Sequence, residues 1–306
     1  MKIIGTGHYL PSKIINNHYF EQTLDTSDEW IVTRTGIKER RFATDETTTT
    51  LGYNASLQAI NNANINKEDI GVIVVATMTP DYLTPSCACM IASKLGLNNS
   101  NVMALDINAA CSGFVYGMSV ANSLLTTNSK KYALLIGTEK LSSILDFEDR
   151  TTCVLFGDGA GAVIIQNDDK KLCSYQNCIG NDEALYALSN ERKLRMNGKD
   201  VFKFAVKAIP EAINSVLEKS NLTLDDIDYV VCHQANLRII THVYKKLKCP
   251  SNKFYVNLDK LGNTSGASIP LALSMMNEEK LLKDGMKIIC VGFGGGLTYG
   301  ATLFEW

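Results

Sequence analysis

The sequence contains one structural pattern twice, and this internal repeat limits the possible folds more than any other feature. The matching segments, each an amphipathic helical pattern followed by an apolar run, are residues 55–63 with 71–76 and residues 212–217 with 229–232. Asp69 and Asp226 stand just before the two apolar runs. A chain that repeats a helix and a strand in this order is expected to form two equivalent halves.

Two further matches follow downstream in the same order. In the first match, Leu105-Asp106 corresponds to Leu258-Asp259, and Ser112-Gly113 to Ser265-Gly266. In the second match, residues 131–137 correspond to residues 287–292. We therefore predict two halves, at about 1–165 and 166–306. The polar residues 167–171 are the segment that most resembles a boundary between them. Each half alternates helical patterns with short apolar runs, which is typical of α/β units around buried sheets.

Composition excludes several classes of function. The chain has 306 residues, 45% of them hydrophobic, and a formal net charge of -2, so no overall charge favours nucleic acid or a membrane surface. No apolar run approaches the roughly 20 residues that cross a bilayer, and the N-terminus lacks the apolar core of a signal peptide. We expect a soluble, cytoplasmic protein that spans no membrane.

The cysteines predict no metal centre. There are nine of them, an odd number, without a Cys-x-x-Cys pair, and only four histidines accompany them. A zinc or iron–sulfur site would need closely spaced pairs of such ligands. Most of these cysteines lie in apolar runs, where a cysteine is usually a small buried hydrophobe.

Cys111 differs from the other cysteines in its position. It follows a predicted strand at 102–107 and begins a predicted helix. Free N–H groups and the dipole at a helix N-terminus lower the pKa of a thiol and favour the nucleophilic thiolate. Gly113 leaves room for a substrate beside it. The local pattern alone also fits a buried structural cysteine before a tight turn.

Three more features lie at comparable junctions. Asn263 stands at the equivalent turn of the second half, where we expect it to face Cys111, although it also fits an ordinary helix cap. His233 directly follows the predicted strand 229–232, at the end of a strand where α/β sheets place ligand groups. The glycines at 292–296 lack the lysine of a nucleotide-binding loop and could supply an oxyanion donor beside the Cys111 N–H.

With these residues in this order, the sequence resembles the thiolase superfamily, and specifically the β-ketoacyl-acyl-carrier-protein synthase III family. The resemblance covers nearly the whole chain. Its motifs are Asp-Thr-Ser-Asp-Glu-Trp-Ile at 25–31, Arg-Thr-Gly-Ile-Lys-Glu-Arg at 34–40, Ala-Cys-Ser-Gly-Phe at 110–114, Asp-Arg at 149–150, Phe-Gly-Asp-Gly-Ala-Gly at 156–161, His-Gln-Ala-Asn-Leu-Arg-Ile-Ile at 233–240, Gly-Asn-Thr-Ser at 262–265 and Gly-Phe-Gly-Gly-Gly at 292–296. It implies an α/β thiolase-like fold, in which two pseudo-symmetric βαβαβ-type halves form a layered αβαβα body.

The resemblance also implies roles for single residues. Cys111 would accept the acyl group, His233 and Asn263 would stabilise the enolate left by malonyl decarboxylation, and Gly295 would be the second oxyanion donor. The coenzyme A tunnel would be lined by Trp30, Arg34, Arg150, Phe202, Asn236 and Arg238, with Trp30 and Arg150 flanking the adenine. The acidic acyl carrier protein would dock on Gln234, Ala235, Asn236, Leu237, Arg238, Lys203, Lys245 and Lys246, although such lysines also fit a solvated helix face.

The implied reaction is a decarboxylating Claisen condensation in two half-reactions. An acyl-CoA acylates Cys111, and malonyl-acyl-carrier-protein then loses CO2 and attacks the acyl group, which starts fatty-acid synthesis without a cofactor or a metal. The family also implies a homodimer. A condensing enzyme of secondary metabolism remains the alternative, and an inactive or purely carrier-binding homologue disagrees with the intact Cys111, His233 and Asn263.

Other thiolase-like activities fit less well. A degradative thiolase needs a second catalytic cysteine in the glycine loop, and Cys290 precedes that loop. A 3-hydroxy-3-methylglutaryl-CoA synthase would use a glutamate base, for which Glu139 is the candidate, and a chalcone-synthase-like enzyme usually has a proline in the loop. The chain also departs from the family pattern. Residues 180–196 look short, which is expected to alter the acyl-CoA entrance, and Lys199 stands where an asparagine is often found. Thr84 stands where some relatives carry a bulky aromatic, which leaves the acyl primer open.

Overall fold

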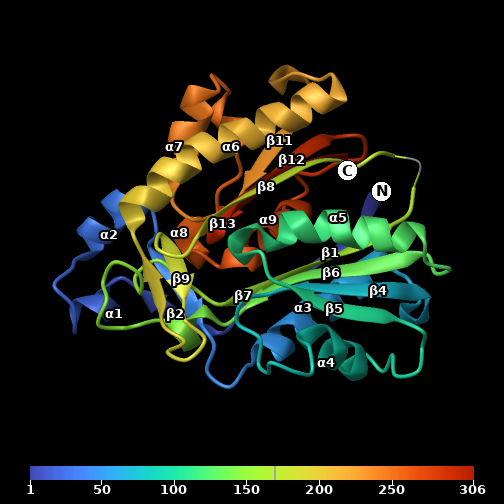
Figure 1. The fold of residues 1–306 in the computed structure, drawn as a ribbon, viewed down its shortest axis with the longest axis horizontal. Helices are drawn as coiled ribbons and strands as arrows, with labels where there is room; N and C mark the ends of the chain where they lie inside the picture. The colour runs from blue at the N-terminus through green and yellow to red at the C-terminus, as the bar shows by residue number, and fades with distance from the viewer. Residues whose placement is uncertain (169) are drawn as a thin grey trace.

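The computed structural model describes residues 1–168 and 170–306, which form a layered α/β body (Figure 1). One sheet has the strand order β1-β7-β6-β4-β5. Its strands are β1 (Lys2–Tyr9), β7 (Gly159–Gln166), β6 (Tyr132–Glu139), β4 (Ile70–Ala76) and β5 (Met103–Ile107). Strand β4 runs parallel to β5 and β6, and β7 runs antiparallel to β6 and β1.

The other sheet repeats this plan for four of the five strands. Its order is β11-β12-β13-β8, formed by β11 (Tyr229–Cys232), β12 (Lys287–Gly294), β13 (Gly296–Glu305) and β8 (Cys173–Asn181). Strands β11 and β12 are parallel, and β13 is antiparallel to both of its neighbours. Among the described residues, the second sheet has no full strand equivalent to β5. At that position it has only an isolated parallel bridge between Val230 and Phe254. The polar residues 167–171 between the sheets include Asp169, which lies outside the described residues.

Helices cover both sheets and fill the space between them (Figure 1). Helices α3 (Thr48–Ala63) and α4 (Cys87–Lys94) cover the first sheet from outside, and α6 (Gly198–Ser220) and α7 (Leu237–Lys246) cover the second. Helices α5 (Gly113–Thr126) and α9 (Ser268–Glu278) pack between the sheets. Since both faces of the sheets are covered, β4 is buried along its whole length. The predicted αβαβα layering is confirmed.

The two inner helices begin in the same way. A 3₁₀ turn precedes each of them, η2 (Ala110–Ser112) before α5 and η6 (Ser265–Ala267) before α9. The first residue of each turn is a non-glycine residue with positive φ, 45° at Ala110 and 48° at Ser265. Such strained residues tend to gather at functional sites. The repeat thus brings two strained turns together in the middle of the molecule.

These turns correct the predicted register of the repeat. The structure pairs Ala110 with Ser265, and therefore Cys111 with Gly266, whereas the sequence match had paired Cys111 with Thr264. The match of Leu105-Asp106 with Leu258-Asp259 is wrong, because the first pair lies in β5 and the second in helix α8 (Leu258–Leu261). By contrast, Asp69 and Asp226 end the 3₁₀ turns η1 (Lys67–Asp69) and η4 (Leu224–Asp226) before β4 and β11, as their match predicted.

The remaining elements gather at one end of the layers, at the left of Figure 1. They include the short helices α1 (His18–Glu21) and α2 (Asp28–Thr35) and two small two-stranded antiparallel sheets. One sheet pairs β2 (Lys13–Asn16) with β3 (Glu39–Phe42), which follows α1 and α2, and the other is the hairpin of β9 (Leu185–Ala187) and β10 (Leu194–Met196). The described 3₁₀ turns η3 (Leu141–Ile144) and η5 (Ser251–Lys253) complete the connections.

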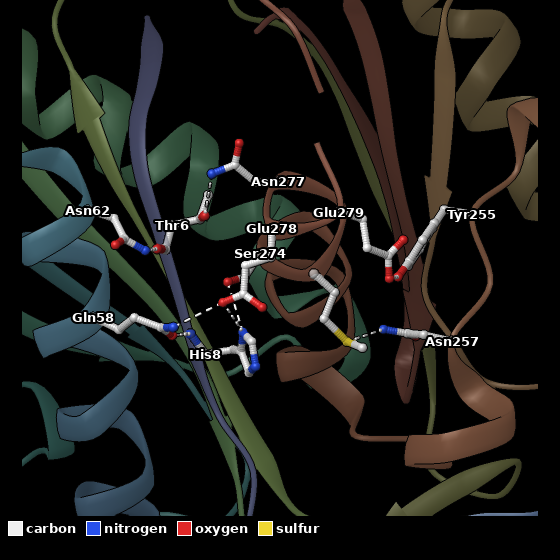
Figure 2. Close-up of polar contacts among 11 residues, drawn as sticks. Thr6, His8, Gln58, Asn62, Tyr255, Asn257, Ser274, Asn277, Glu278 and Glu279 are labelled. Carbon is white, nitrogen blue, oxygen red and sulfur yellow. Dashed lines mark hydrogen bonds and ion pairs between the residues drawn. The ribbon is translucent and has the colours of Figure 1, made fainter. Parts of the chain in front are cut away.

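Polar contacts tie the first strand to the last helix (Figure 2). His8 Nδ1 of β1 lies 3.0 Å from Ser274 Oγ of α9, and Asn277 Nδ2 donates to Thr6 Oγ1 at 3.2 Å. From α3, Gln58 Nε2 donates to Glu278 Oε1 at 3.0 Å. His8 is therefore a structural residue. None of the described helices is both long and apolar enough to cross a membrane.

Candidate active site

Cys111 lies in η2, between the end of β5 and the start of α5, with only 4% of its surface exposed. The glycine-rich end of β12 packs directly against it. A Cβ atom added to Gly294 would lie 2.7 Å from the Cys111 backbone nitrogen, and one added to Gly292 would lie 3.1 Å from Ser112 Cα. Side chains at these two positions would displace the cysteine, so close backbone approach requires the glycines.

Burial controls the charge of this thiol. It raises the pKa of Cys111 to about 12, and the nearby Glu139 carboxylate raises that pKa further, although a hydrogen bond from Ser265 opposes them. The expectation that the start of α5 lowers this pKa is therefore wrong, because desolvation outweighs the helix terminus. Cys111 is protonated at neutral pH, and its thiolate forms only if another group takes the proton.

His233 continues β11 into the site. Its backbone N–H donates to Val291 O at 2.8 Å, and Ser268 Oγ lies 2.7 Å from its Nδ1. The Gln234 N–H donates to the same hydroxyl oxygen at 3.4 Å, and we assign the hydroxyl hydrogen to Nδ1 and the ring proton to Nε2. Burial lowers the pKa of His233 to about 3. The ring is therefore a neutral donor through Nε2.

Asn263 is held by the backbone around it. Its N–H donates to Leu155 O at 2.8 Å, and its carbonyl accepts from Gly157 N at 3.0 Å. The Ser265 N–H donates to Asn263 Oδ1 at 2.8 Å. Because the amide oxygen is engaged in this way, the Nδ2 group remains to donate to a substrate.

The three residues come together at one cavity. Cys111, His233 and Asn263 line a space of about 110 Å³ together with Phe293 and Gly294. They come from η2, the end of β11 and the turn before η6, which are far apart in the sequence. The sequence hypothesis that they share one site therefore agrees with the geometry.

Two larger cavities share wall residues with this cavity. The inner one, about 350 Å³, shares Cys111, Phe156 and Leu185 with it and also has Met78, Leu194 and Gly295 in its wall. The outer one, about 440 Å³, shares Leu155, Gly198 and Asn236 with it. The cavities thus form a series that runs from the outer one, past the nucleophile, to the inner one.

The outer cavity is aromatic and basic. Its wall contains every residue predicted for the coenzyme A tunnel, namely Trp30, Arg34, Arg150, Phe202, Asn236 and Arg238, together with Lys199 and Lys203. The guanidinium carbons of Arg34 and Arg150 lie 4.4 Å and 5.3 Å from the centre of the Trp30 ring. Arg150 also donates to the Asp25 backbone carbonyl. An adenine between Trp30 and Arg150 therefore requires the arginine to move away from the ring.

The residues predicted for carrier-protein docking differ in their exposure. Lys203, Leu237, Arg238, Lys245 and Lys246 are exposed on α6 and α7, and Ala235 and Asn236 are half-buried. Gln234 is only 1% exposed. Its amide donates to Cys232 O and Tyr255 O and accepts from Asn257 N. Direct docking on Gln234 is therefore a wrong expectation, because the side chain supports the loop from inside.

Sequence reasoning missed residues that support the catalytic side chains. Ser268 sets the tautomer of His233, and the Phe293 ring lies edge-on to the imidazole with 5.2 Å between ring centres. Leu185, on the β9–β10 hairpin, lines both the inner cavity and the one that contains Cys111, His233 and Asn263. Phe293 lies within the glycine motif at 292–296 but was given no role there, and no motif distinguishes Ser268 or Leu185. Among the described residues, no group of histidine, cysteine or acidic side chains is arranged to hold a metal ion.

Comparison with known proteins agrees with this geometry. Two family profiles match, "3-Oxoacyl-[acyl-carrier-protein (ACP)] synthase III" over residues 105–179 and its C-terminal counterpart over residues 217–306. The chain is 48% identical to Beta-ketoacyl-[acyl-carrier-protein] synthase III of Clostridium acetobutylicum, and the match covers 100% of this chain and 98% of the relative. It is also 48% identical to the protein of that name from Acholeplasma laidlawii, with the same coverage.

Solved structures give the same result. The crystal structure of 3-oxoacyl-[acyl-carrier-protein] synthase III from Aquifex aeolicus superposes with a TM-score of 0.96 at 44% identity, covering 100% of this chain and 99% of that one. The corresponding Thermus thermophilus structure gives a TM-score of 0.94 at 39% identity, with the same coverage. The similarity therefore extends over both sheets.

Proposed function

Because this chain belongs to the β-ketoacyl-acyl-carrier-protein synthase III family, we propose that it joins an acyl group from acyl-CoA to malonyl-acyl-carrier-protein, and that Cys111, His233 and Asn263 carry out the chemistry. The products are β-ketoacyl-carrier-protein, CoA and CO2, and the reaction starts fatty-acid synthesis. The observation that carries the assignment of residues is the single cavity lined by these three side chains.

Cys111 performs the first half-reaction. The outer cavity takes acyl-CoA, with its arginines and lysines near the phosphates, and the thioester reaches Cys111 through the shared wall at Leu155, Gly198 and Asn236. Attack by sulfur develops negative charge on the thioester oxygen, which the N–H groups of Cys111 and Gly295 stabilise. The acyl chain then lies in the inner cavity, whose wall contains apolar side chains such as Met78, Phe156 and Leu194.

His233 and Asn263 act in the second half-reaction. Loss of CO2 from the malonyl group leaves an enolate, whose oxygen needs fixed donors in a site without water. His233 Nε2–H and Asn263 Nδ2–H are such donors, because hydrogen bonds to Ser268 and Ser265 engage their other polar atoms. A neutral imidazole suits this task, since it stabilises the oxygen without protonating the carbanion.

The carrier protein docks beside the outer cavity. The exposed face formed by Lys203, Arg238, Lys245 and Lys246 is positive, as binding of an acidic carrier protein requires. Lys246 Nζ donates to Val206 O and Lys203 pairs with Asp200 at 3.4 Å. Both side chains are exposed, so these contacts are weak enough to exchange for the carrier.

We also propose that the enzyme is a cytoplasmic homodimer. Among the described strands, β5 pairs only with β4 and forms an edge of its sheet, where Met103 is 52% exposed. A second copy that pairs with this edge would remove its unpaired backbone groups. All nine cysteines are free thiols, as is usual in the reducing cytoplasm.

Intact-mass measurement tests the first half-reaction. Wild type and Cys111→Ala are incubated with a panel of acyl-CoAs and then with malonyl-carrier-protein. A single acyl adduct on the wild type alone, discharged with release of CO2, is expected and identifies the primer. An adduct that Cys111→Ala retains, or no adduct with any donor, contradicts the proposal.

Two further variants separate the half-reactions. His233→Ala and Asn263→Ala should still form the acyl adduct but lose malonyl decarboxylation by roughly 10²- to 10³-fold, because each removes one oxyanion donor. His18→Ala is the control, since His18 is exposed and bonds only to Glu21 among the described contacts. Loss of adduct formation in the two variants would contradict their assignment to the second half-reaction.

A further inference from the structure

A fully buried arginine packs against the turn that carries Asn263. Arg40 is the last residue of the motif at 34–40, and it lies in β3 with none of its surface exposed. None of the described ion pairs includes it. Burial lowers its pKa to about 10, so the side chain remains a cation at neutral pH. A charge buried without a counter-ion opposes folding, which suggests that it has a specific task.

The guanidinium group of Arg40 joins two separate segments of the chain. Its Nη1 donates to Ile15 O at 3.2 Å and to Asn17 Oδ1 at 2.8 Å. Its Nη2 donates to Val154 O at 2.5 Å. Because both nitrogens belong to one planar, rigid group, the end of β2 and the segment at 154–157 are linked at a fixed separation.

The acceptor on the β2 side is itself held in place. Asn17 is fully buried, and its Nδ2 donates to Asp28 Oδ1 and to Ile37 O, both at 2.8 Å. These two bonds assign the amide oxygen to the side that faces Arg40. Asp28 is the first residue of α2, and the Phe20 ring covers the guanidinium, with its centre 4.9 Å from the Arg40 Cζ. The arginine is therefore fixed on this side by a network rather than by one contact.

The segment that receives Nη2 is the one that holds Asn263. The residue after Val154 is Leu155, whose carbonyl accepts from the Asn263 N–H at 2.8 Å. The Gly157 N–H donates to the Asn263 carbonyl at 3.0 Å, and Phe156 and Asn263 form a parallel bridge between these two bonds. The carbonyl that the guanidinium holds is therefore one residue away from the carbonyl that holds the Asn263 backbone.

The aliphatic part of Arg40 packs against the same turn. A Cβ atom added to Gly157 would lie 2.9 Å from Arg40 Cβ, and one added to Gly262 would lie 3.1 Å from it. Gly262 is the residue before Asn263, and its positive φ of 64° favours glycine. Both glycines that adjoin the Asn263 backbone thus let the stem of the arginine approach it closely.

The amide of Asn263 depends on the position of this backbone. Because the Ser265 N–H donates to Asn263 Oδ1 at 2.8 Å, the direction of Nδ2 is set by the turn at 263–265. Donors to a developing enolate act strongly only if they are fixed in advance. A displacement of the turn would therefore move the donor away from the enolate oxygen.

We propose that Arg40 is a positioning residue for Asn263, and that it holds the turn by joining Ile15 and Asn17 to Val154 O. This inference rests on the proposed function and adds to it a residue that touches neither the substrate nor the reacting atoms. Arg40 is not in the walls of the three cavities around Cys111, so it acts through Asn263.

The test measures the two half-reactions separately in wild type, Arg40→Met and Arg40→Lys. Intact mass follows the acyl adduct at saturating acyl-CoA, because Val154 also lines the outer cavity, and release of CO2 follows decarboxylation of malonyl-carrier-protein. Arg40→Met should acylate within about 3-fold of the wild-type rate but decarboxylate roughly 10- to 100-fold more slowly, as a donor displaced by up to about 1 Å predicts. Arg40→Lys should be equally slow, because its single nitrogen cannot join both segments.

A double-mutant cycle tests whether the effect passes through Asn263. In Asn263→Ala the donor is already lost, so the addition of Arg40→Met should slow decarboxylation by less than about 3-fold further. A second full loss in this background would mean that Arg40 acts independently of Asn263, and the inference would be wrong. Wild-type decarboxylation by Arg40→Lys would also overturn it, since the charge alone would then be sufficient.

Arg41→Met is the matched control. Arg41 is the next residue of β3, its side chain lies on the other face of the strand, and its Nη1 donates to Pro11 O at 3.4 Å. This variant should keep both wild-type rates. Asn17→Ala removes one acceptor of the guanidinium and should cause a smaller loss with the same dependence on Asn263, which decides the question if Arg40→Met does not fold.

Two further outcomes separate this inference from the proposed function. Equal loss of both half-reactions in Arg40→Met would make Arg40 a general structural residue and would contradict its role in positioning Asn263. If the wild type itself forms no acyl adduct, the proposed function fails instead.

Discussion

At the scale of single residues, burial decides the charge of each reactive group around Cys111. It raises the pKa values of the thiol and of Glu139 and lowers that of His233. All three groups are therefore driven towards their neutral forms, since a low-dielectric interior opposes charge. A reaction that creates a thiolate in such a place needs an acceptor close by.

The raised pKa of Glu139 predicts a pH-dependent stability. The folded state binds this proton more tightly than the unfolded state, with a pKa of about 7 against 4.5. The stabilisation is fully present below pH 4.5 and is lost as the pH rises through 7, by about 3 kcal/mol. Relative to wild type, Glu139→Gln should therefore gain free energy of unfolding between pH 5 and 8. Urea denaturation at a fixed protein concentration measures this, and a pH-independent difference would contradict the raised pKa.

At the scale of elements, the site depends on how closely β12 approaches η2. The two contact each other because Gly292 and Gly294 have no side chains facing Cys111 and Ser112. The backbone that holds Asn263 also depends on a glycine, because a Cβ atom at Gly157 would lie 2.5 Å from Leu261 O. Backbone contact of this kind positions the reactive groups more rigidly than contact between flexible side chains.

Gly294→Ala should therefore impair acylation strongly. Its Cβ atom would lie 2.7 Å from the Cys111 backbone nitrogen and 2.9 Å from Cys111 Cβ, so either the cysteine or the end of β12 must shift. We expect the acylation rate to fall by roughly 10²-fold, the cost of misplacing a reacting group by about 1 Å. Gly180→Ala is the matched control, because nothing lies within 4 Å of its added Cβ atom. Equal acylation by the two variants would show that the close approach is unimportant.

At the scale of the whole molecule, the two sheets differ at one edge. The first sheet ends at β5, whereas a bridge to Phe254 takes this place in the second sheet. Leu83, in the loop between β4 and α4, is 97% exposed. An exposed apolar side chain and a free sheet edge each favour association with a second copy.

Met103→Lys should weaken the proposed dimer. In a two-fold interface each substitution occurs twice, so the lysine adds a positive charge to both copies of β5 at the edge. Sedimentation equilibrium should give a dissociation constant at least 10-fold higher than that of the wild type. Ile14→Lys is the matched control, since Ile14 is 51% exposed on β2 against 52% for Met103. A wild-type monomer, or a Met103→Lys dimer as tight as the control, would contradict pairing through β5.

The sequence by itself determined the layered fold and the identity of the catalytic candidates. Repeated helix and strand patterns require two similar sheets with helices on both faces, because apolar runs must be buried on both sides. Cys111, His233 and Asn263 could be singled out because each stands at the junction that follows or precedes a strand or helix. Such junctions can be read from local patterns, and the family motifs around them are specific.

Only the tertiary structure decided the register of the repeat and the charges in the site. Identical dipeptides such as Leu105-Asp106 and Leu258-Asp259 lie in different elements, because backbone geometry and not residue identity defines equivalence. The burial of Gln234, the bond from Ser268 to His233 and the approach of Glu139 to Cys111 join residues distant in the chain. Desolvation depends on everything packed around a group, and no local pattern contains that information.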